Sequence, residues 1–197
     1  MLIQQFKDLS PLVSRNSLLS YAFQQSKHKG HILEFGVYKG DSINFLAKLS
    51  DGHVTGFDSF EGLPEDWKRS DNSVYKKGHF HLKGTFPPVE ENVTLVKGFF
   101  EDSLKLWMAM QATKTASFIH IDCDLYGGCL YVLETLNDWI VPGTIIVFDE
   151  LANFGNGVYK DWKDGEWRAL NEWEETYKRT LKPIGRTNTY QAAIQVE

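Results

Sequence analysis

The sequence predicts an α/β protein with a Rossmann-like, doubly wound and mostly parallel seven-stranded sheet that ends in an antiparallel C-terminal hairpin. Short apolar runs alternate with segments of helical periodicity over residues 31–148, and this alternation is typical of parallel sheets covered by helices on both faces. An acidic residue or a glycine turn directly follows most of these apolar runs. Because ligands bind at the carboxyl ends of parallel strands, the pattern predicts a polar site at one edge of the sheet.

The predicted elements follow one another along the chain. A helix is expected near residues 9–28, with Ser10 as its N-cap and Pro11 as its first residue. Strands are then expected at residues 31–35, 54–57, 93–96, 117–121 and 144–148. Helices are expected between them at residues 41–49, 101–111 and 128–139. The chain continues with a charged, Trp-rich helix over 166–179 and two strands over 181–187 and 190–196, which form the antiparallel hairpin.

A long segment without clean periodicity, residues 60–92, separates the second strand from the third. It holds three of the six prolines, and loops of this length are uncommon in compact domains unless they act as lids or binding loops. Its aromatic residues are Trp67, Tyr75, Phe80 and Phe86. They either close over ligands and stack on a sugar ring or pack the loop onto the body, and both alternatives stay open. We expect a single domain over residues 1–197, with this segment as a lid or substrate loop.

The composition limits the possible functions. A chain of 197 residues with 42% hydrophobic content suits one domain with a substantial core. The net charge of −5 argues against a nucleic-acid partner, because the 21 basic residues do not form a cluster. No apolar run approaches the length of a membrane span, and the first residues lack the order of a signal peptide, so we expect a soluble, cytoplasmic protein. Cys123 and Cys129 are expected to be free thiols.

The turn after the first strand indicates a nucleoside cofactor. Gly36 and Gly40 permit close backbone approach and direct a helix N-terminus at an anionic group. Glu34 ends the strand, where a carboxylate can hold an ammonium group. Asp58 follows 24 residues later, close to the roughly 20 expected for a ribose-binding acid. The middle glycine of a dinucleotide fingerprint is missing, so the pattern favours a nucleoside that carries an amino acid, and a plain glycine turn is the alternative.

Two pairs of acidic residues follow the later strands. Asp122 and Asp124 come after residues 117–121 and project to one side if the chain is still extended there. Asp149 and Glu150 end the next strand, and a right-handed crossover brings the four carboxylates together. With no Arg or Lys nearby in the sequence, the cluster predicts a hard divalent cation such as Mg²⁺ or Ca²⁺. The alternative is that these residues cap helices and face solvent.

Four motifs resemble those of class I S-adenosylmethionine-dependent methyltransferases, and more closely the macrocin O-methyltransferase (TylF-like) family of sugar O-methyltransferases. They are Leu33-Glu34-Phe35-Gly36-Val37-Tyr38-Lys39-Gly40-Asp41-Ser42, Gly56-Phe57-Asp58-Ser59-Phe60-Glu61-Gly62-Leu63-Pro64, His120-Ile121-Asp122-Cys123-Asp124-Leu125-Tyr126 and Phe148-Asp149-Glu150. The second and third are the most specific. The resemblance implies a metal-assisted O-methyltransferase that uses S-adenosyl-L-methionine and a divalent cation, with Mg²⁺ the leading candidate. The implied acceptor is a hydroxyl of a sugar or another polyhydroxylated small molecule.

The resemblance also implies which residues bind the methyl donor. It assigns the methionine amine to Glu34 and the methionine carboxylate to the turn over Gly36–Ser42. It assigns the ribose hydroxyls to Asp58, and it frames the adenine with Phe100 and Glu101. The full set of implied cofactor-binding residues is Glu34, Gly36, Tyr38, Gly40, Ser42, Asp58, Ser59, Phe100 and Glu101.

For the cation, the resemblance implies Asp122, Asp149 and Glu150 as ligands and leaves Asp124 as the general base. Relatives commonly carry paired aspartates where this chain has Asp149-Glu150. The longer Glu150 therefore binds the ion directly, through water, or not at all. His120, in a predicted buried strand, is expected to be a hydrogen-bonded core histidine rather than a base.

Two other functions stay open on the sequence. One is another Rossmann-type cofactor enzyme such as a dehydrogenase, against which the missing middle glycine counts. The other is a noncatalytic protein that binds a nucleoside cofactor. The sequence also leaves open the identity of the acceptor and the formation of a homo-oligomer.

Overall fold

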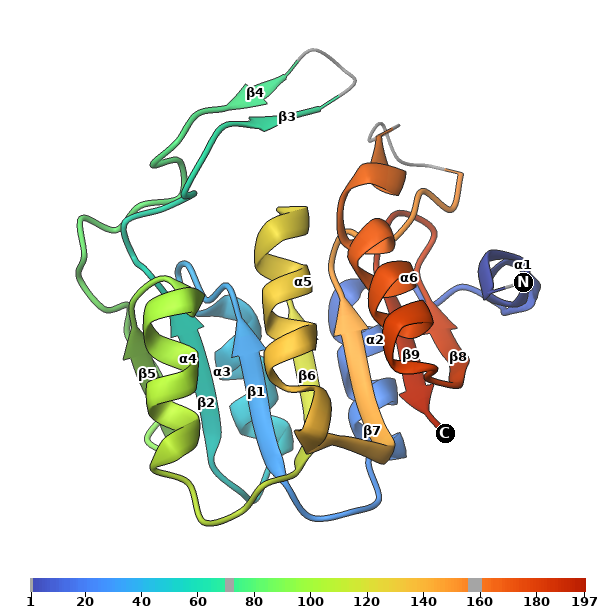
Figure 1. The fold of residues 1–197 in the computed structure, drawn as a ribbon, viewed down its shortest axis with the longest axis horizontal. Coiled ribbons are helices and arrows are strands. Elements are labelled where there is room, and N and C mark those ends of the chain that lie inside the picture. Colours follow the sequence, from blue (N-terminus) through green and yellow to red (C-terminus); the bar gives the residue numbers. More distant parts are fainter. Residues whose placement is uncertain (1, 70–72, 156–160) are drawn as a thin grey trace.

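The computed structural model describes residues 2–69, 73–155 and 161–197, and it has the predicted α/β architecture. Its seven-stranded sheet has the order β5-β2-β1-β6-β7-β9-β8 (Figure 1). The strands are β1 (His31–Phe35), β2 (Val54–Asp58), β5 (Val93–Lys97), β6 (Ala116–Ile121), β7 (Ile140–Phe148), β8 (Leu181–Arg186) and β9 (Ala192–Val196). Strand β9 lies between β7 and β8 and is antiparallel to both. The mostly parallel sheet and its C-terminal hairpin are thus confirmed.

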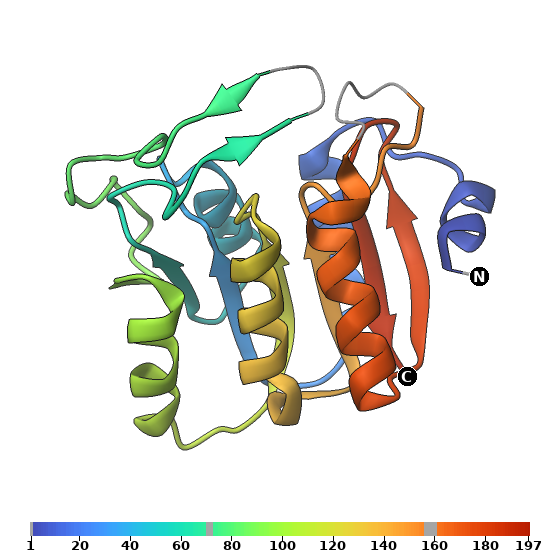
Figure 2. The same ribbon diagram turned by 45° about the horizontal axis from the view of Figure 1, so that its top comes forward.

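Helices cover both faces of the sheet. Helices α4 (Phe100–Ala109), α5 (Tyr126–Thr135) and α6 (Glu166–Tyr177) lie on one face, and α2 (Arg15–Gln25) and α3 (Asp41–Leu49) lie on the other (Figures 1 and 2). The short helix α1 (Leu2–Asp8) contacts β8 at the sheet edge. Two 3-10 turns, η1 (Asn137–Trp139) and η2 (Trp162–Asp164), precede β7 and α6. Among the described residues, no helix is long and apolar enough to cross a membrane.

The core consists of two apolar layers, one on each face of the sheet. Successive side chains of a strand point to opposite faces, so the apolar runs supply both layers at once. On β6, Phe118 packs with the α2 and α3 side chains, while its neighbour Ile119 packs with those of α4, α5 and α6. All six residues of β6 are buried, as is typical of a central strand in a parallel sheet. The strands that end at the predicted site are therefore rigidly held.

The N-terminal region differs from the prediction. The helix expected over residues 9–28 is present but shorter, as α2, and it is preceded by α1, which was not predicted; between the two helices Leu12 pairs with Thr187. The N-cap of α2 is Ser14, whose hydroxyl accepts a hydrogen bond from a backbone N–H of the first turn, so the expected N-cap at Ser10 was wrong. Pairing with the sheet edge outweighs the local helical periodicity in this region.

Some element boundaries also move by a few residues. Helix α4 begins at Phe100 and α5 at Tyr126, each slightly before the expected start. Strand β7 begins at Ile140, so the Pro142-Gly143 turn lies inside it, where the pairing with β6 is irregular. These differences do not change the order of the elements.

The described residues of the predicted loop over 60–92 begin beyond the carboxyl ends of the parallel strands (Figures 1 and 2) and return along α3 to the start of β5, where the Asn92 amide donates to the Ala47 carbonyl at 3.0 Å. They contain a small antiparallel hairpin made of β3 (Trp67–Lys68) and β4 (Val74–Tyr75). Residues 70–72 of this predicted loop fall outside the described residues. The base of the segment is closed by the backbone N–H groups of Leu82 and Gly84, which both donate to the Phe60 carbonyl at 2.9 Å.

Candidate active site

The register of the parallel strands brings four strand ends to one level. Phe35 of β1 pairs with Phe57 of β2 on one side and with Ile121 of β6 on the other. Ile121 in turn pairs with Phe148 of β7. The strand order reverses between β1 and β6, which is where open α/β sheets bind their ligands. The residues that follow this row are Gly36, Asp58, Asp122 and Asp149.

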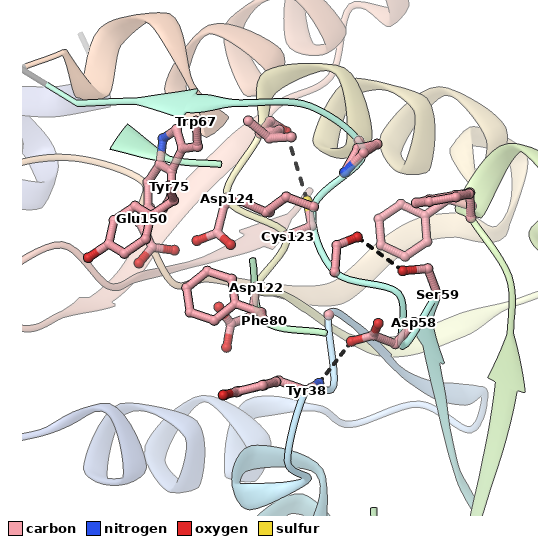
Figure 3. Close-up of a pocket in the computed structure, with 18 of the residues that line it drawn as sticks. Tyr38, Asp58, Ser59, Trp67, Tyr75, Phe80, Asp122, Cys123, Asp124 and Glu150 are labelled. Atoms are coloured by element: carbon pink, nitrogen blue, oxygen red, sulfur yellow. Dashed lines mark hydrogen bonds between the residues drawn. The ribbon is translucent and has the colours of Figure 1, made fainter. Parts of the chain in front are cut away.

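A cavity of about 350 Å³ lies at this edge and extends beneath the segment over residues 60–92 (Figure 3). The predicted site residues that line it are Gly36, Tyr38, Asp58, Ser59, Phe100, Glu101, Asp122, Asp124 and Glu150. The segment contributes Trp67, Arg69, Tyr75 and Phe80. Two of the three predicted metal ligands, Asp122 and Glu150, therefore share one cavity with residues predicted to bind the cofactor, whereas Asp149 does not line it.

The turn between β1 and α3 lies directly against the end of β6. Gly36 has a φ of 92°, and a Cβ atom there would lie 1.8 Å from the Asp122 carbonyl oxygen. Gly40 caps α3 with a φ of 88°. Both values fall in the left-handed region that favours glycine. The first glycine is thus required both for its backbone conformation and for the close approach of two strand ends.

Asp58 fixes the conformation of this turn. Its Oδ2 atom accepts hydrogen bonds from the backbone N–H groups of Val37 and Tyr38, both at 2.8 Å, and Figure 3 shows the bond from Tyr38. Its Oδ1 atom accepts from the Phe60 N–H at 2.7 Å. One carboxylate therefore connects the glycine turn with the start of the segment above the cavity. This contact between neighbouring strand ends was not part of the sequence prediction.

Glu34 lies outside the cavity, although it was expected to face the ligand. Its side chain is fully buried. Oε1 accepts a hydrogen bond from the Ser42 hydroxyl at 3.0 Å, and Oε2 lies 2.8 Å from His120 Nδ1. Ser42 and Gly40 are also absent from the cavity lining. In this arrangement Glu34 supports the turn from beneath, and its contact with a methionine amine stays a prediction.

His120 is a buried, hydrogen-bonded core histidine, as predicted. Its Nε2 atom lies 3.8 Å from Asp149 Oδ1, beyond hydrogen-bond reach, so their attraction is electrostatic. Burial alone lowers the pKa of His120, but Asp149 and Glu34 outweigh burial and raise this pKa to about 10. At neutral pH the ring is an imidazolium between two carboxylates.

The predicted acidic residues converge on two overlapping groups. Possible ligand atoms of Asp122, Asp124 and Glu150 lie within 4.8 Å of one another (Figure 3). Those of His120, Asp122 and Asp149 do so as well. The backbone geometry that brings these side chains together differs from the prediction. Strand β6 ends before Asp122, and the backbone of Asp124 has a left-handed φ of 63°. A turn, rather than the side-chain alternation of a strand, directs Asp124 toward its neighbours.

Burial dominates the electrostatics of these groups. It raises the pKa of Asp122, Glu150 and Asp124, and nearby Asp149 raises each of them further, so the pKa of Asp124 reaches about 7. For Asp149, burial is outweighed by His120 and Arg15, and its pKa is lowered. Within the described residues, Asp149 Oδ1 and Glu150 Oε2 are buried without a hydrogen-bond partner. A desolvated, oxygen-rich donor set of this kind fits a hard divalent cation.

Comparison with known proteins identifies the family. The sequence profile of a family described as "Methyltransferase domain" matches residues 33–151, a span that contains every predicted site residue. The chain belongs to this family. It is an S-adenosylmethionine-dependent methyltransferase, so the predicted enzyme class is confirmed. No curated protein matches the sequence of this methyltransferase.

Solved structures share the fold of the methyltransferase. The calicheamicin methyltransferase CalS11 has a TM-score of 0.69 and 21% identity, over 98% of this chain and 90% of that chain. The O-methyltransferase NovP has a TM-score of 0.61 and 17% identity, over 91% and 76%. The O-methyltransferase TomG from Streptomyces achromogenes, in complex with SAM, has a TM-score of 0.55 and 16% identity, over 99% and 88%. Likeness at these identities establishes the fold.

The methyltransferase site also contains residues that sequence reasoning missed. Arg15, the first residue of α2, places its guanidinium 3.2 Å from Asp122 Oδ2 and 3.6 Å from Asp149 Oδ2. The argument that the acidic cluster has no basic partner was therefore wrong, because this partner lies 107 residues away in the sequence. Glu166, at the start of α6, is fully buried and accepts a hydrogen bond from the Glu150 N–H at 2.9 Å. No local pattern marks either residue.

Proposed function

We propose that this methyltransferase transfers a methyl group from S-adenosylmethionine to a hydroxyl of a sugar or another polyhydroxylated small molecule, with the assistance of a divalent cation. The observation that carries the proposal is the group formed by Asp122, Asp124 and Glu150 in the same cavity as the predicted donor-binding residues. A hydroxyl becomes a good nucleophile only when its proton is removed, and carboxylates with a bound cation serve that need.

The likeness to sugar-modifying enzymes supports this acceptor class. A second structure of CalS11, with a TM-score of 0.63, is described as a TDP-rhamnose 3'-O-methyltransferase. We also propose that the protein is related to the macrocin O-methyltransferase (TylF-like) family, and the four sequence motifs support this. The match to a methyltransferase family speaks against a dehydrogenase, which was an alternative on the sequence alone.

The donor is proposed to lie along the ends of β1 and β2 and the start of α4. Asp58 and Ser59 then hold the ribose, and Phe100 and Glu101 frame the adenine. Asp58 has two oxygens with about four acceptor positions, and three are used by backbone N–H groups. The remaining capacity suits one ribose hydroxyl. The methionine carboxylate is assigned to the turn over residues 36–42, in which the Val37 and Tyr38 N–H groups already donate to Asp58.

The predicted ligands Asp122, Asp149 and Glu150 would hold the cation. Asp122 is common to both possible ligand groups, while Glu150 shares one of them with Asp124 and Asp149 shares the other with His120. When bound, the cation would polarise the acceptor hydroxyl and lower its pKa. Asp124 then accepts the hydroxyl proton. Its pKa of about 7 suits a base that works near neutral pH. Its left-handed backbone supports this role, because strained backbone conformations cluster at functional sites.

The segment over residues 60–92 is proposed to be the lid of a single methyltransferase domain that spans residues 1–197. Trp67 stacks on Tyr75 with ring centroids 5.3 Å apart, and the Arg69 guanidinium lies 5.0 Å from the Trp67 ring. These side chains pack together and also line the cavity. The two sequence-based alternatives for the loop aromatics, packing and stacking on a sugar, are therefore compatible. Closure over the ligands would exclude water from the reacting groups.

Calorimetry on the chelator-treated protein tests the donor assignment. We expect S-adenosylmethionine to bind and NAD⁺ not to bind, with or without Mg²⁺. An acceptor screen follows, in which nucleotide-linked sugars, free sugars and catechols are scored by the release of S-adenosylhomocysteine. Absence of S-adenosylmethionine binding contradicts the proposal, and NAD⁺ binding in its place revives the dehydrogenase. Binding without turnover of any hydroxyl acceptor supports the noncatalytic alternative.

A further inference from the structure

Arg15 meets the acidic cluster from the α2 side of the sheet, not from within the cavity. Its guanidinium contacts one oxygen of Asp122 and one of Asp149, while about a third of the side chain remains exposed. Arg15 is not among the residues that line the cavity, whereas Asp122 is. The carboxylate of Asp122 thus lies between a protein cation and the cavity.

The contact uses oxygen atoms that a metal would also need. The two possible ligand groups contain four carboxylates, those of Asp122, Asp124, Asp149 and Glu150, together with His120, and Asp122 belongs to both groups. The Oδ2 atoms of Asp122 and Asp149 both face Arg15. A divalent cation on these carboxylates would lie close to a guanidinium, and like charges a few ångströms apart repel strongly in a partly buried site.

Arg15 is not needed to hold the backbone of Asp122 and Asp149. The Asp122 N–H donates to the Phe35 carbonyl at 2.8 Å, and the Asp149 N–H donates to the Ile121 carbonyl at 2.9 Å. His120 lies against the Asp149 side chain from within the core. Since the sheet already fixes the backbone of both residues, Arg15 acts on their side-chain carboxylates and on the charge of the cluster.

We propose that Arg15 is a resident counterion of the Asp122 and Asp149 carboxylates that competes with the divalent cation and so sets the metal affinity of the site. The inference rests on the metal-assisted function proposed above. Arg15 acts through Asp122 and not on the acceptor, so it is a positioning residue. It keeps the cluster stable while no cation is bound, and cation binding weakens its contact with Asp122.

Titration of the chelator-treated full chain with Mn²⁺ tests this inference. Arg15→Gln removes the competing charge, and we expect it to tighten Mn²⁺ binding by about tenfold or more. Arg15→Lys keeps a charge and should bind Mn²⁺ with an affinity between those of the wild type and Arg15→Gln. The matched control is Lys48→Gln, which removes one positive charge from an exposed ion pair with Glu90. This control should change Mn²⁺ affinity by less than about twofold.

Equal or weaker Mn²⁺ binding by Arg15→Gln would overturn the inference, and so would the absence of Mn²⁺ binding in both proteins. Binding by Arg15→Gln alone would support it. If Arg15→Gln does not fold, the wild-type Arg15 Nε–H resonance provides the test, because it should shift on Mg²⁺ addition; an unchanged resonance at saturating Mg²⁺ would overturn the inference. S-adenosylmethionine binding by the same metal-free samples reports on the proposed function separately.

Discussion

Replacing Asp58 by alanine is expected to loosen the cofactor turn and weaken donor binding in one step. The change removes three hydrogen bonds of 2.7 to 2.8 Å between the carboxylate and backbone N–H groups. Hydrogen bonds to a charged acceptor contribute about 1.5–3 kcal/mol each, and water replaces part of this at a half-buried site, so we expect a loss of about 3–5 kcal/mol. For a chain of this size, such a loss lowers Tm by about 10 °C.

Asp58→Asn provides a graded comparison. Its side chain keeps one acceptor oxygen, but its amide nitrogen turns a donor toward other donors, so we expect roughly half the loss of the alanine variant. Thermal melting measures the stability, and calorimetry measures S-adenosylmethionine affinity, which should fall by about tenfold to a hundredfold for Asp58→Ala. Asp51→Ala, at an exposed turn, is the control. If Asp58→Ala keeps wild-type Tm and donor affinity, the carboxylate neither holds the turn nor binds the ribose.

Three further predictions concern the acidic cluster and the aromatic residues above it. Asp124→Asn should retain donor binding and lose at least about a hundredfold in turnover, as expected for loss of a general base; wild-type turnover in an S-adenosylhomocysteine release assay would exclude that role. Burial raises the pKa of Asp124 to about 7 and also raises the pKa of Glu150. Above about pH 4, the folded metal-free protein therefore binds more protons than the unfolded chain. Its Tm should therefore fall as the pH rises from 5 to 8, and a divalent cation should reduce this fall; melts at both pH values with and without Mg²⁺ check the sign. Trp67→Ala should raise the acceptor KM about tenfold and leave donor affinity unchanged, which steady-state kinetics and calorimetry separate.

The fold was predictable because its central strands are marked twice in the sequence. Each strand is a short apolar run, and β1, β2, β6 and β7 are each followed by an acid or by a glycine turn. The rule that ligands bind at strand ends then locates the site without knowledge of any side-chain contact. Phe35, Phe57, Ile121 and Phe148 do fall in one row of the sheet. Parallel pairing converts the sequence order of these runs into spatial proximity.

The contacts that were not predicted all depend on tertiary structure. The region around Leu12 has helical periodicity, yet Leu12 pairs with Thr187, directly after β8, and donates its N–H to the Arg186 carbonyl, which no local pattern reveals. Arg15 reaches Asp122 because α2 begins beside the carboxyl end of β6, and that placement follows from the fold as a whole. Likewise, the left-handed backbone of Asp124 arises where the strand turns into α5. Sequence patterns indicate which acids converge but not which partner each acid meets.

The partners divide the acids of this edge into two classes. Asp58 is satisfied by backbone N–H groups, Glu34 by Ser42 and His120, and neither needs an external cation. At the β6 and β7 ends, the donors available in the described structure are fewer than the carboxylate oxygens, and buried oxygens of Asp149 and Glu150 have no hydrogen-bond partner there. A buried carboxylate oxygen without a partner is costly. An added cation would therefore be most favourable at this part of the sheet edge. The unpaired oxygens of Asp149 and Glu150 are those that a cation would bind, so a bound cation should stabilise this part of the edge beyond the support that Arg15 already gives it.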